Sequence, residues 1–164
     1  MPIILITEHF TVEAPDRPIH SRENGGHIEV SPKERYTHRY EMPLEQASSL
    51  MDLTMVVGEA ATNVLRQAGI DIVRGNYQEN GNWAYKPGSV WKPHLHIHIF
   101  FRSTHEKHPD DDPRFQAFPE AMAAPPLETG YYNNFKPLTV EDCAKIKVEI
   151  ERLLATDKYR PIKL

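Results

Sequence analysis

Residues 93–101 of this chain read Pro-His-Leu-His-Ile-His-Ile-Phe-Phe, and this stretch decides how the rest of the sequence is interpreted. Polar and apolar side chains alternate along it, which is the pattern of a β-strand with two different faces. Three imidazoles lie on one face, and a leucine and two isoleucines lie on the other. We expect a strand over residues 94–101 whose apolar face belongs to the core.

Three neighbouring imidazoles favour a functional site over a structural role. A single histidine on a strand is usually a hydrogen-bonded polar residue, whereas three titratable rings side by side contribute little to stability, because each must be paired or solvated. Two chemistries suit such a face. The ring nitrogens can bind zinc together with a further ligand and water. Alternatively, a neutral imidazole attacks as a nucleophile while its neighbours hold phosphoryl oxygens and protonate the leaving group.

The remaining elements predict an α+β fold. The connection between the two strands expected over residues 70–77 and 94–101 is too short for a crossover helix, so these strands should pair antiparallel. We expect one domain over residues 1–164, with an antiparallel sheet of about five strands, a long helix and a C-terminal helix. The other expected strands cover residues 3–7, 10–13 and 27–31, and the expected helices cover residues 43–68 and 139–155.

Composition points to an ordinary globular chain. Apolar residues make up 40% of the 164 residues and charged residues 26%, close to the averages for globular proteins. The net charge of −4 and the lack of a Lys/Arg block argue against a duplex nucleic acid partner. Cys143 is the single cysteine, which excludes a disulfide framework. The apolar run at residues 3–7 is too short for a signal peptide or a membrane span, so we expect a cytoplasmic protein.

One region stands apart in composition. Residues 102–138 are rich in proline and charge, which predicts a long surface segment instead of a second domain. The acidic run at residues 110–112 is expected to be solvated, and His105 and His108 to be exposed loop residues. The loop over residues 76–83 mixes donors with aromatic side chains and suits a ligand loop or a plain turn equally well.

The histidine stretch resembles the histidine-triad proteins. Their pattern of His, apolar, His, apolar, His, apolar, apolar is matched at every position by residues 94–100. Residues 26–33 read Gly-His-Ile-Glu-Val-Ser-Pro-Lys, which is similar to the glycine-histidine strand of that family, and the resemblance spans roughly residues 8–101. It implies a histidine-triad-like fold, a homodimer, and a nucleotide hydrolase or nucleotidyltransferase that cleaves at the α-phosphate without a cofactor.

The resemblance also implies a role for each of four histidines. His96 is the implied nucleophile, which forms a nucleotidyl-histidine that water then hydrolyses. His98 binds the phosphate and assists the leaving group, His94 orients the neighbouring ring, and His27 is the fourth histidine that joins them. The implied substrate is a small AMP-like or GMP-like nucleotide.

Four further residues are implied to bind substrate. Asn76 resembles the asparagine that the family places beside the phosphate, and Glu13 stands where a ribose-binding carboxylate is usual. Residues 88–93 read Gly-Ser-Val-Trp-Lys-Pro, whereas the family has Gly-Gln-Ser-Val and one aromatic residue before the first histidine. Because the glutamine is missing, Ser89 and Lys92 are candidate phosphate contacts.

Two other functions stay open. One is a zinc-dependent hydrolase in which the histidine cluster supplies the ligands. The other is a nucleotide-binding protein of the same fold that has lost turnover through its altered loop at residues 88–93. Phe10 and Ile28 either line a base pocket or belong to the core, and the core is the preferred interpretation.

Overall fold

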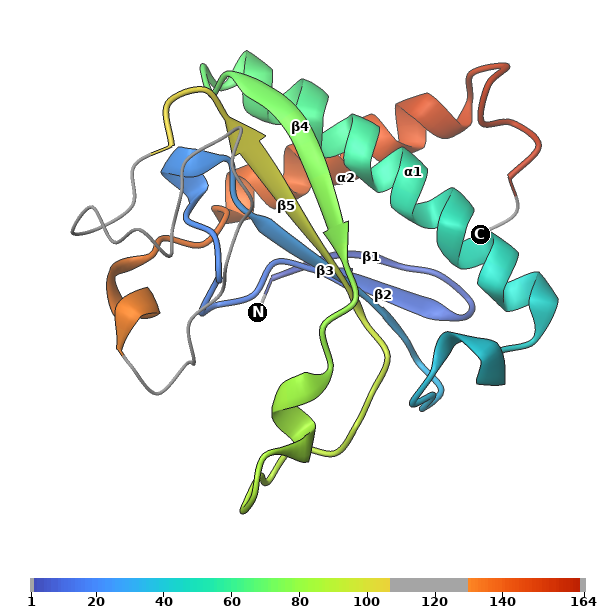
Figure 1. Cartoon of the computed structure of the whole chain (residues 1–164). Coiled ribbons are helices and arrows are strands. Elements are labelled where there is room, and N and C mark those ends of the chain that lie inside the picture. The colour runs from blue at the N-terminus through green and yellow to red at the C-terminus, as the bar shows by residue number, and fades with distance from the viewer. Residues whose placement is uncertain (1, 107–129, 163–164) are drawn as a thin grey trace.

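The computed structural model describes residues 2–106 and 130–162, without the side chains of Asn82 and Trp83. An antiparallel five-stranded sheet in the order β1-β2-β3-β5-β4 carries two long helices on one side (Figure 1), so the expected α+β fold is confirmed. His108 and residues 110–112 lie outside the described residues. The elements are β1 (Ile3–Ile6), β2 (Phe10–Glu13), β3 (His27–Pro32), α1 (Leu44–Gln67), β4 (Ile72–Gln78), β5 (Ile97–Ser103) and α2 (Val140–Leu154).

Helix α1 forms the long cover of the sheet. Pro43 is its N-cap residue, and the helix ends where Gly69 adopts a φ of +84°, a left-handed conformation that favours glycine. The apolar residues recur every three or four positions and are buried, which explains the boundaries expected from the sequence. The buried apolar residues are Leu50, Leu53, Val56, Val57, Ala60, Ala61, Val64 and Leu65.

Helix α2 begins with a capping box. The Thr139 hydroxyl accepts from the Asp142 backbone N–H at 3.0 Å, and the Asp142 carboxylate accepts from the Thr139 backbone N–H at 2.8 Å. Cys143, Ile146 and Ile150 form the inward stripe of this helix and are buried against the core.

The two faces of the sheet have opposite character. Val12, Ile28 and Val30 are fully buried and belong to the core, as does Phe10, which confirms the core interpretation of Phe10 and Ile28. The opposite face carries polar residues from adjacent strands. Glu29 of β3 pairs in register with His98 of β5, and directly paired residues project to the same side of a sheet. The histidines therefore face away from the helices.

The strand expected over residues 94–101 is displaced along the chain. Strand β5 begins at Ile97 and ends at Ser103, so His94 and His96 precede it. Pro93 has no N–H, and the Leu95 N–H donates to the Tyr36 carbonyl at 2.7 Å and not to a neighbouring strand. Ladder pairing therefore starts only after the second histidine.

The beginning and the end of the expected surface segment 102–138 are buried, which corrects that prediction. Arg102 lies in β5 with 1% of its surface exposed, and Glu106 accepts from its guanidinium at 2.5 and 2.7 Å. Tyr132 and Leu138 are also buried. The charge of Arg102 is tolerated in the interior because Glu106, four residues later, pairs with it. Composition alone does not reveal such a pair.

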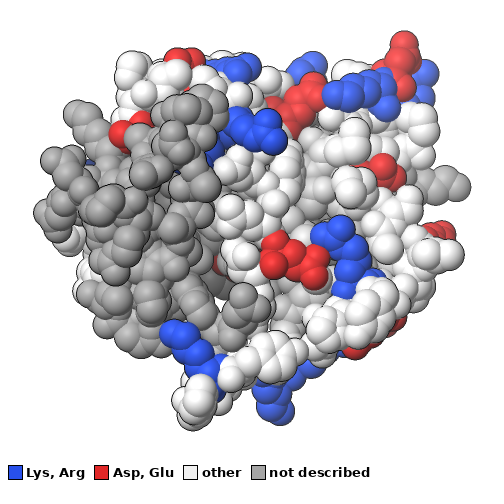
Figure 2. Space-filling view, in the orientation of Figure 1, with Lys and Arg blue, Asp and Glu red and all other residues white. Residues whose placement is uncertain are grey.

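The described surface is mixed in charge. On the face shown in Figure 2, acidic and basic side chains are interspersed among uncharged ones. Within the described residues, no helix combines the length and the apolar character needed to cross a membrane.

Candidate functional site

His96 sits where the chain enters β5, and its ring orientation is determined by its neighbour. Its Nδ1 lies 2.9 Å from the backbone carbonyl oxygen of His94. A carbonyl can only accept a hydrogen bond, so Nδ1 carries the proton and Nε2 keeps its lone pair. His96 is half-buried, and its ring lies edge-on to that of His98 with the centroids 4.5 Å apart. An unprotonated nitrogen is thus available beside a second imidazole.

His94 contacts His96 through its backbone carbonyl, and His94 also lines the pocket beside His96. The ring is half-buried, and burial together with the nearby His96 and Arg35 lowers the pKa of His94. A neutral His94 adds no positive charge beside His96. The backbone carbonyl of His94 contacts the His96 ring, and the orienting role implied for His94 stays a prediction.

His27 and His98 form a direct contact between adjacent strands. Nε2 of His27 lies 2.9 Å from Nδ1 of His98, and both rings are almost completely buried. The Ile19 backbone N–H donates to Nδ1 of His27 at 3.3 Å. Burial lowers the pKa of His27 to about 3, so this ring is neutral at neutral pH. The four predicted histidines are therefore brought together in one chain of contacts.

The ring of Phe100 packs against both His27 and His98. It follows His98 by two positions in β5, pairs in register with His27, and is fully buried. Its ring centroid lies 4.7 Å from that of His27 and 5.6 Å from that of His98. Aromatic packing of this kind restricts both imidazoles, which keeps their nitrogens in place.

Glu29 is a member of the site that the sequence reasoning did not select. Its Oε1 lies 3.3 Å from Nδ1 of His98 and 3.5 Å from Nε2 of His27. Burial alone would raise the pKa of Glu29, but the hydrogen bond with His98 and the nearby imidazoles outweigh it, and the pKa is lowered. The alternation of β3 already put Glu29 on the face of His27, and that signal could have found it.

The described residues contain one group of three side chains close enough to share a metal ion, namely His27, Glu29 and His98. Their ligand atoms lie within 4.8 Å of one another. Zinc bound to Nε2 of His27 would require the proton of this neutral ring to move to Nδ1, where it would face the Ile19 N–H. The hydrogen bonding of His27 therefore does not fit a metal ligand.

Asn76 and Gln78 of β4 lie on the same side of the sheet as the histidines. Gln78 pairs in register with His98, whereas Asn76 pairs with Phe100, which lies two residues further from His96 along β5. Both amides are half-buried. Asn76 was the predicted residue and Gln78 was not, because the register between β4 and β5 depends on a bulge between Ile72 and Arg74.

Glu13 extends the polar row by one strand. It pairs in register with Glu29 across β2 and β3. Burial and the nearby Glu29 carboxylate raise the pKa of Glu13, so the two acids share one environment and Glu29 holds the charge more readily. Glu13 is separated from His98 by the width of strand β3.

Ser89 and Lys92 lie in the loop between β4 and β5 that projects beyond the sheet in Figure 1. The Ser89 hydroxyl accepts from the Trp91 backbone N–H at 3.2 Å, and Lys92 is exposed. Among the described contacts, neither residue touches the four histidines, so their implied phosphate contact remains a prediction.

A pocket of about 160 Å³ opens beside the two histidines that precede β5. It lies between this segment, the chain that follows β3 and the chain that follows β4. Its lining is mixed in polarity and includes Thr37, His38, Glu79, Asn80 and Tyr85, next to His94 and His96. The pocket therefore offers space for a small group next to His94 and His96.

Three solved structures share this architecture. A hypothetical histidine-triad nucleotide-binding protein from Sulfolobus tokodaii is 19% identical with a TM-score of 0.55, covering 93% of this chain and 85% of its own. A histidine-triad protein from Marinobacter aquaeolei is 17% identical with a TM-score of 0.54, covering 98% and 90%. A zinc-bound histidine-triad family protein from Mycobacterium smegmatis is 19% identical with a TM-score of 0.53, covering 92% and 84%.

The chain therefore has the histidine-triad fold, and the resemblance seen in its sequence is confirmed at the level of the fold. No protein-family model matches the sequence, and no curated protein is significantly similar to it.

Proposed function

We propose that this protein is a nucleotide hydrolase or nucleotidyltransferase that cleaves at the α-phosphate through a covalent nucleotidyl-histidine at His96. The observation that carries the proposal is the tautomer of His96, whose Nδ1–H donates to the His94 carbonyl and leaves Nε2 free to attack. A nucleotide ligand is also supported by the Sulfolobus neighbour of the same fold, which is described as nucleotide-binding.

The reaction follows from the positions of the histidines. Nε2 of His96 bonds to the α-phosphorus as the bond to the leaving group breaks, and His98 protonates that group. Water then attacks the same phosphorus, its proton passes to His98, and the bond to His96 breaks. Gln78 and Asn76 flank the phosphate from β4, and the pocket beside His94 receives a substituent of the phosphate.

Trapping the adduct tests the proposal. The protein is mixed with a nucleoside phosphoramidate, a dinucleoside polyphosphate or a nucleotide sugar, quenched, and digested for mass spectrometry. We expect a nucleoside monophosphate on His96, no adduct and no turnover in His96→Gly, and full activity in His105→Ala, which changes an exposed histidine outside the site. Turnover by a folded His96→Gly variant would refute the mechanism.

The same samples separate the other two functions. A zinc-dependent hydrolase would contain stoichiometric zinc when purified without a histidine tag, and a chelator would remove its activity. A non-catalytic nucleotide-binding protein would bind AMP in calorimetry without adduct or cleavage. We propose that no metal is required, since the hydrogen bond from Ile19 directs the His27 proton toward the position a metal would occupy.

We also propose a homodimer that pairs through the β4 edge of the sheet. Strand β4 is an outer strand, and its exposed side chains include Val73 and Tyr77. Sedimentation over a range of concentrations tests this. We expect Val73→Arg to shift the protein toward the monomer, whereas Val148→Arg, which changes a more exposed valine on α2, should leave the association unchanged.

A further inference from the structure

Glu29 places a carboxylate against the imidazole pair from the centre of the sheet. It lies in register between Glu13 on β2 and His98 on β5. Its Oε1 is 3.3 Å from Nδ1 of His98 and 3.5 Å from Nε2 of His27, and 21% of the side chain is exposed. Burial this deep makes an unpaired carboxylate costly, so the position calls for a cationic or hydrogen-bonding partner.

The hydrogen bond from the Ile19 backbone determines which ring nitrogens carry protons when His27 and His98 are both neutral. The Ile19 N–H donates to Nδ1 of His27, so the proton of this ring resides on Nε2. That proton points at Nδ1 of His98, 2.9 Å away. A neutral His98 therefore accepts at Nδ1 and carries its own proton on Nε2, while Glu29 receives no proton from this hydrogen bond.

A neutral His98 is a poor acid. Donating its single proton from Nε2 would leave an imidazolate, which is far too basic to form near neutral pH. An imidazolium, by contrast, can give up the Nε2 proton and keep the one on Nδ1. Its Nδ1–H needs an acceptor, which His27 does not offer because it presents an N–H itself. Oε1 of Glu29 is an acceptor within reach of both N–H groups, 3.3 Å from Nδ1 of His98 and 3.5 Å from Nε2 of His27. When His98 is an imidazolium, both rings therefore donate to Glu29, and the 2.9 Å contact between them is no longer a hydrogen bond.

We propose that Glu29 is a positioning residue that holds His98 as an imidazolium, so that Nε2 of His98 can protonate the leaving group. This inference rests on the function proposed above. In the first step, the bond from His96 to phosphorus forms, the bond to the leaving group breaks, and the Nε2 proton moves to that group. Neutral His98 keeps its Nδ1 proton toward Glu29. In the second step, the attacking water gives a proton back to Nε2.

The surrounding charges agree with this role. Glu29 and His27 reach His98 from β3, His96 approaches from the segment before β5, and β4 offers the uncharged Asn76 and Gln78. Helices α1 and α2 cover the opposite face (Figure 1). Glu13 and His20 are further from His98: Glu13 lies next to Glu29 on β2, and His20 lies near His27. Glu29 is thus the carboxylate in contact with the pair.

Nuclear magnetic resonance tests the contact independently of turnover. The ring-nitrogen signals of His98, which report the nitrogen that carries a proton, are recorded at neutral pH in the wild type, Glu29→Gln and Glu13→Gln. We expect a proton on Nδ1 of His98 in the wild type and in Glu13→Gln, which removes a charge one strand away, and an unprotonated Nδ1 in Glu29→Gln. The same Nδ1 signal in the wild type and a folded Glu29→Gln variant would overturn the inference.

Leaving-group dependence tests the chemical role. We expect Glu29→Gln to lower kcat/KM about 100-fold on a nucleoside phosphoramidate, whose amine must be protonated. On a nitrophenyl ester of the same nucleotide the loss should stay below about threefold, because nitrophenolate leaves without a proton. Equal losses on both substrates, or zinc bound by the wild type and lost in Glu29→Gln, would overturn the inference.

The two proposals can fail separately. If no adduct forms on His96, the proposed function fails, while the Nδ1 signal of His98 still reports the contact with Glu29. If the adduct forms but the Nδ1 signal of His98 does not respond to Glu29→Gln, the enzyme function holds and the role of Glu29 is wrong.

Discussion

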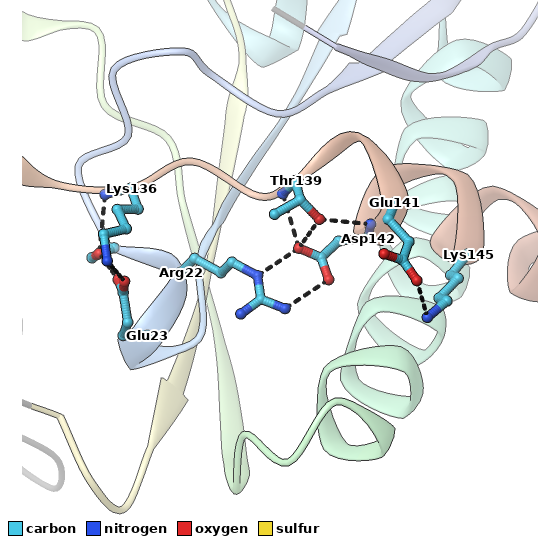
Figure 3. A network of polar contacts seen from close by, with 8 residues as sticks. Arg22, Glu23, Lys136, Thr139, Glu141, Asp142 and Lys145 are labelled. Carbon is cyan, nitrogen blue, oxygen red and sulfur yellow. Dashed lines mark hydrogen bonds and ion pairs between the residues drawn. The ribbon is translucent and has the colours of Figure 1, made fainter.

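Arg22 and Asp142 are 120 positions apart in sequence and form a two-pronged ion pair, with distances of 2.6 and 2.9 Å (Figure 3). Arg22 lies in the short 3-10 helix η1 (Arg22–Asn24) that leads into β3, and Asp142 lies in the first turn of α2. Burial alone would raise the pKa of Asp142, but hydrogen bonds from Arg22 and Thr139 lower it to about 2. The pair ties the strand that carries His27 to the C-terminal helix.

Removing this pair should destabilise the protein measurably. We expect Arg22→Met to lower the free energy of unfolding by about 2 kcal/mol, because a buried carboxylate loses two charge-assisted hydrogen bonds. Urea denaturation measures the change. Lys145→Met is the control, since it breaks the exposed pair with Glu141 in the same helix and should cost less than about 0.5 kcal/mol. Similar losses in both variants would contradict the prediction.

Gly25 marks a close approach between η1 and β5. Its φ is +131°, and an added Cβ would stand 1.7 Å from the backbone oxygen of Phe101. We expect Gly25→Ala to cost more than about 2 kcal/mol or to prevent folding, because the strand carbonyl cannot move without breaking the ladder. Gly69→Ala is the matched control, with a φ of +84° and no atom within 4 Å, and should cost about 1 kcal/mol. Thermal denaturation of both variants decides the comparison.

Burial of His27 predicts a pH dependence of stability. Its pKa falls from the ordinary 6.5 to about 3, so between these values the unfolded chain binds a proton that the folded chain does not. The free energy of unfolding should therefore increase with pH across this window. Equivalently, the protein loses stability as the pH falls from 6.5 toward 3, because protonation of His27 then favours the unfolded chain. We expect a shallower slope in His27→Gln and an unaltered slope in His105→Gln. A slope equal to the wild type in His27→Gln would refute this.

The register of β4 predicts which amide matters more. Gln78 pairs with His98 and Asn76 with Phe100, so Gln78 lies closer to the phosphate of the proposed reaction. We expect Gln78→Ala to lower kcat/KM by about 10-fold to 100-fold, the effect of one lost hydrogen bond to a charged group, and Asn76→Ala to have a smaller effect. Steady-state kinetics on one substrate measures both. A larger loss in Asn76→Ala would favour the residue chosen from the sequence.

Local patterns in the sequence predicted the elements well. The helices expected over residues 43–68 and 139–155 both appear in the structure within a residue or two, because apolar spacing and end signals depend on residues a few positions apart. The alternation around His96 and His98 predicted a histidine face opposite an apolar one, because side-chain direction in extended backbone has a period of two. This pattern and the glycine-histidine motif were enough to predict the histidine-triad fold.

Contacts between distant segments were beyond such patterns. The place of Gln78, the contact of Glu29 with His98 and the Arg22–Asp142 pair become visible only when strand register and helix docking are known, since a shift of one residue turns every side chain to the other face. The sequence by itself therefore determined the histidine cluster and the face of the sheet that it shares with Glu29. Only the tertiary structure decided the proton positions, because they depend on Ile19 and Glu29 meeting His27 and His98 across separate parts of the chain.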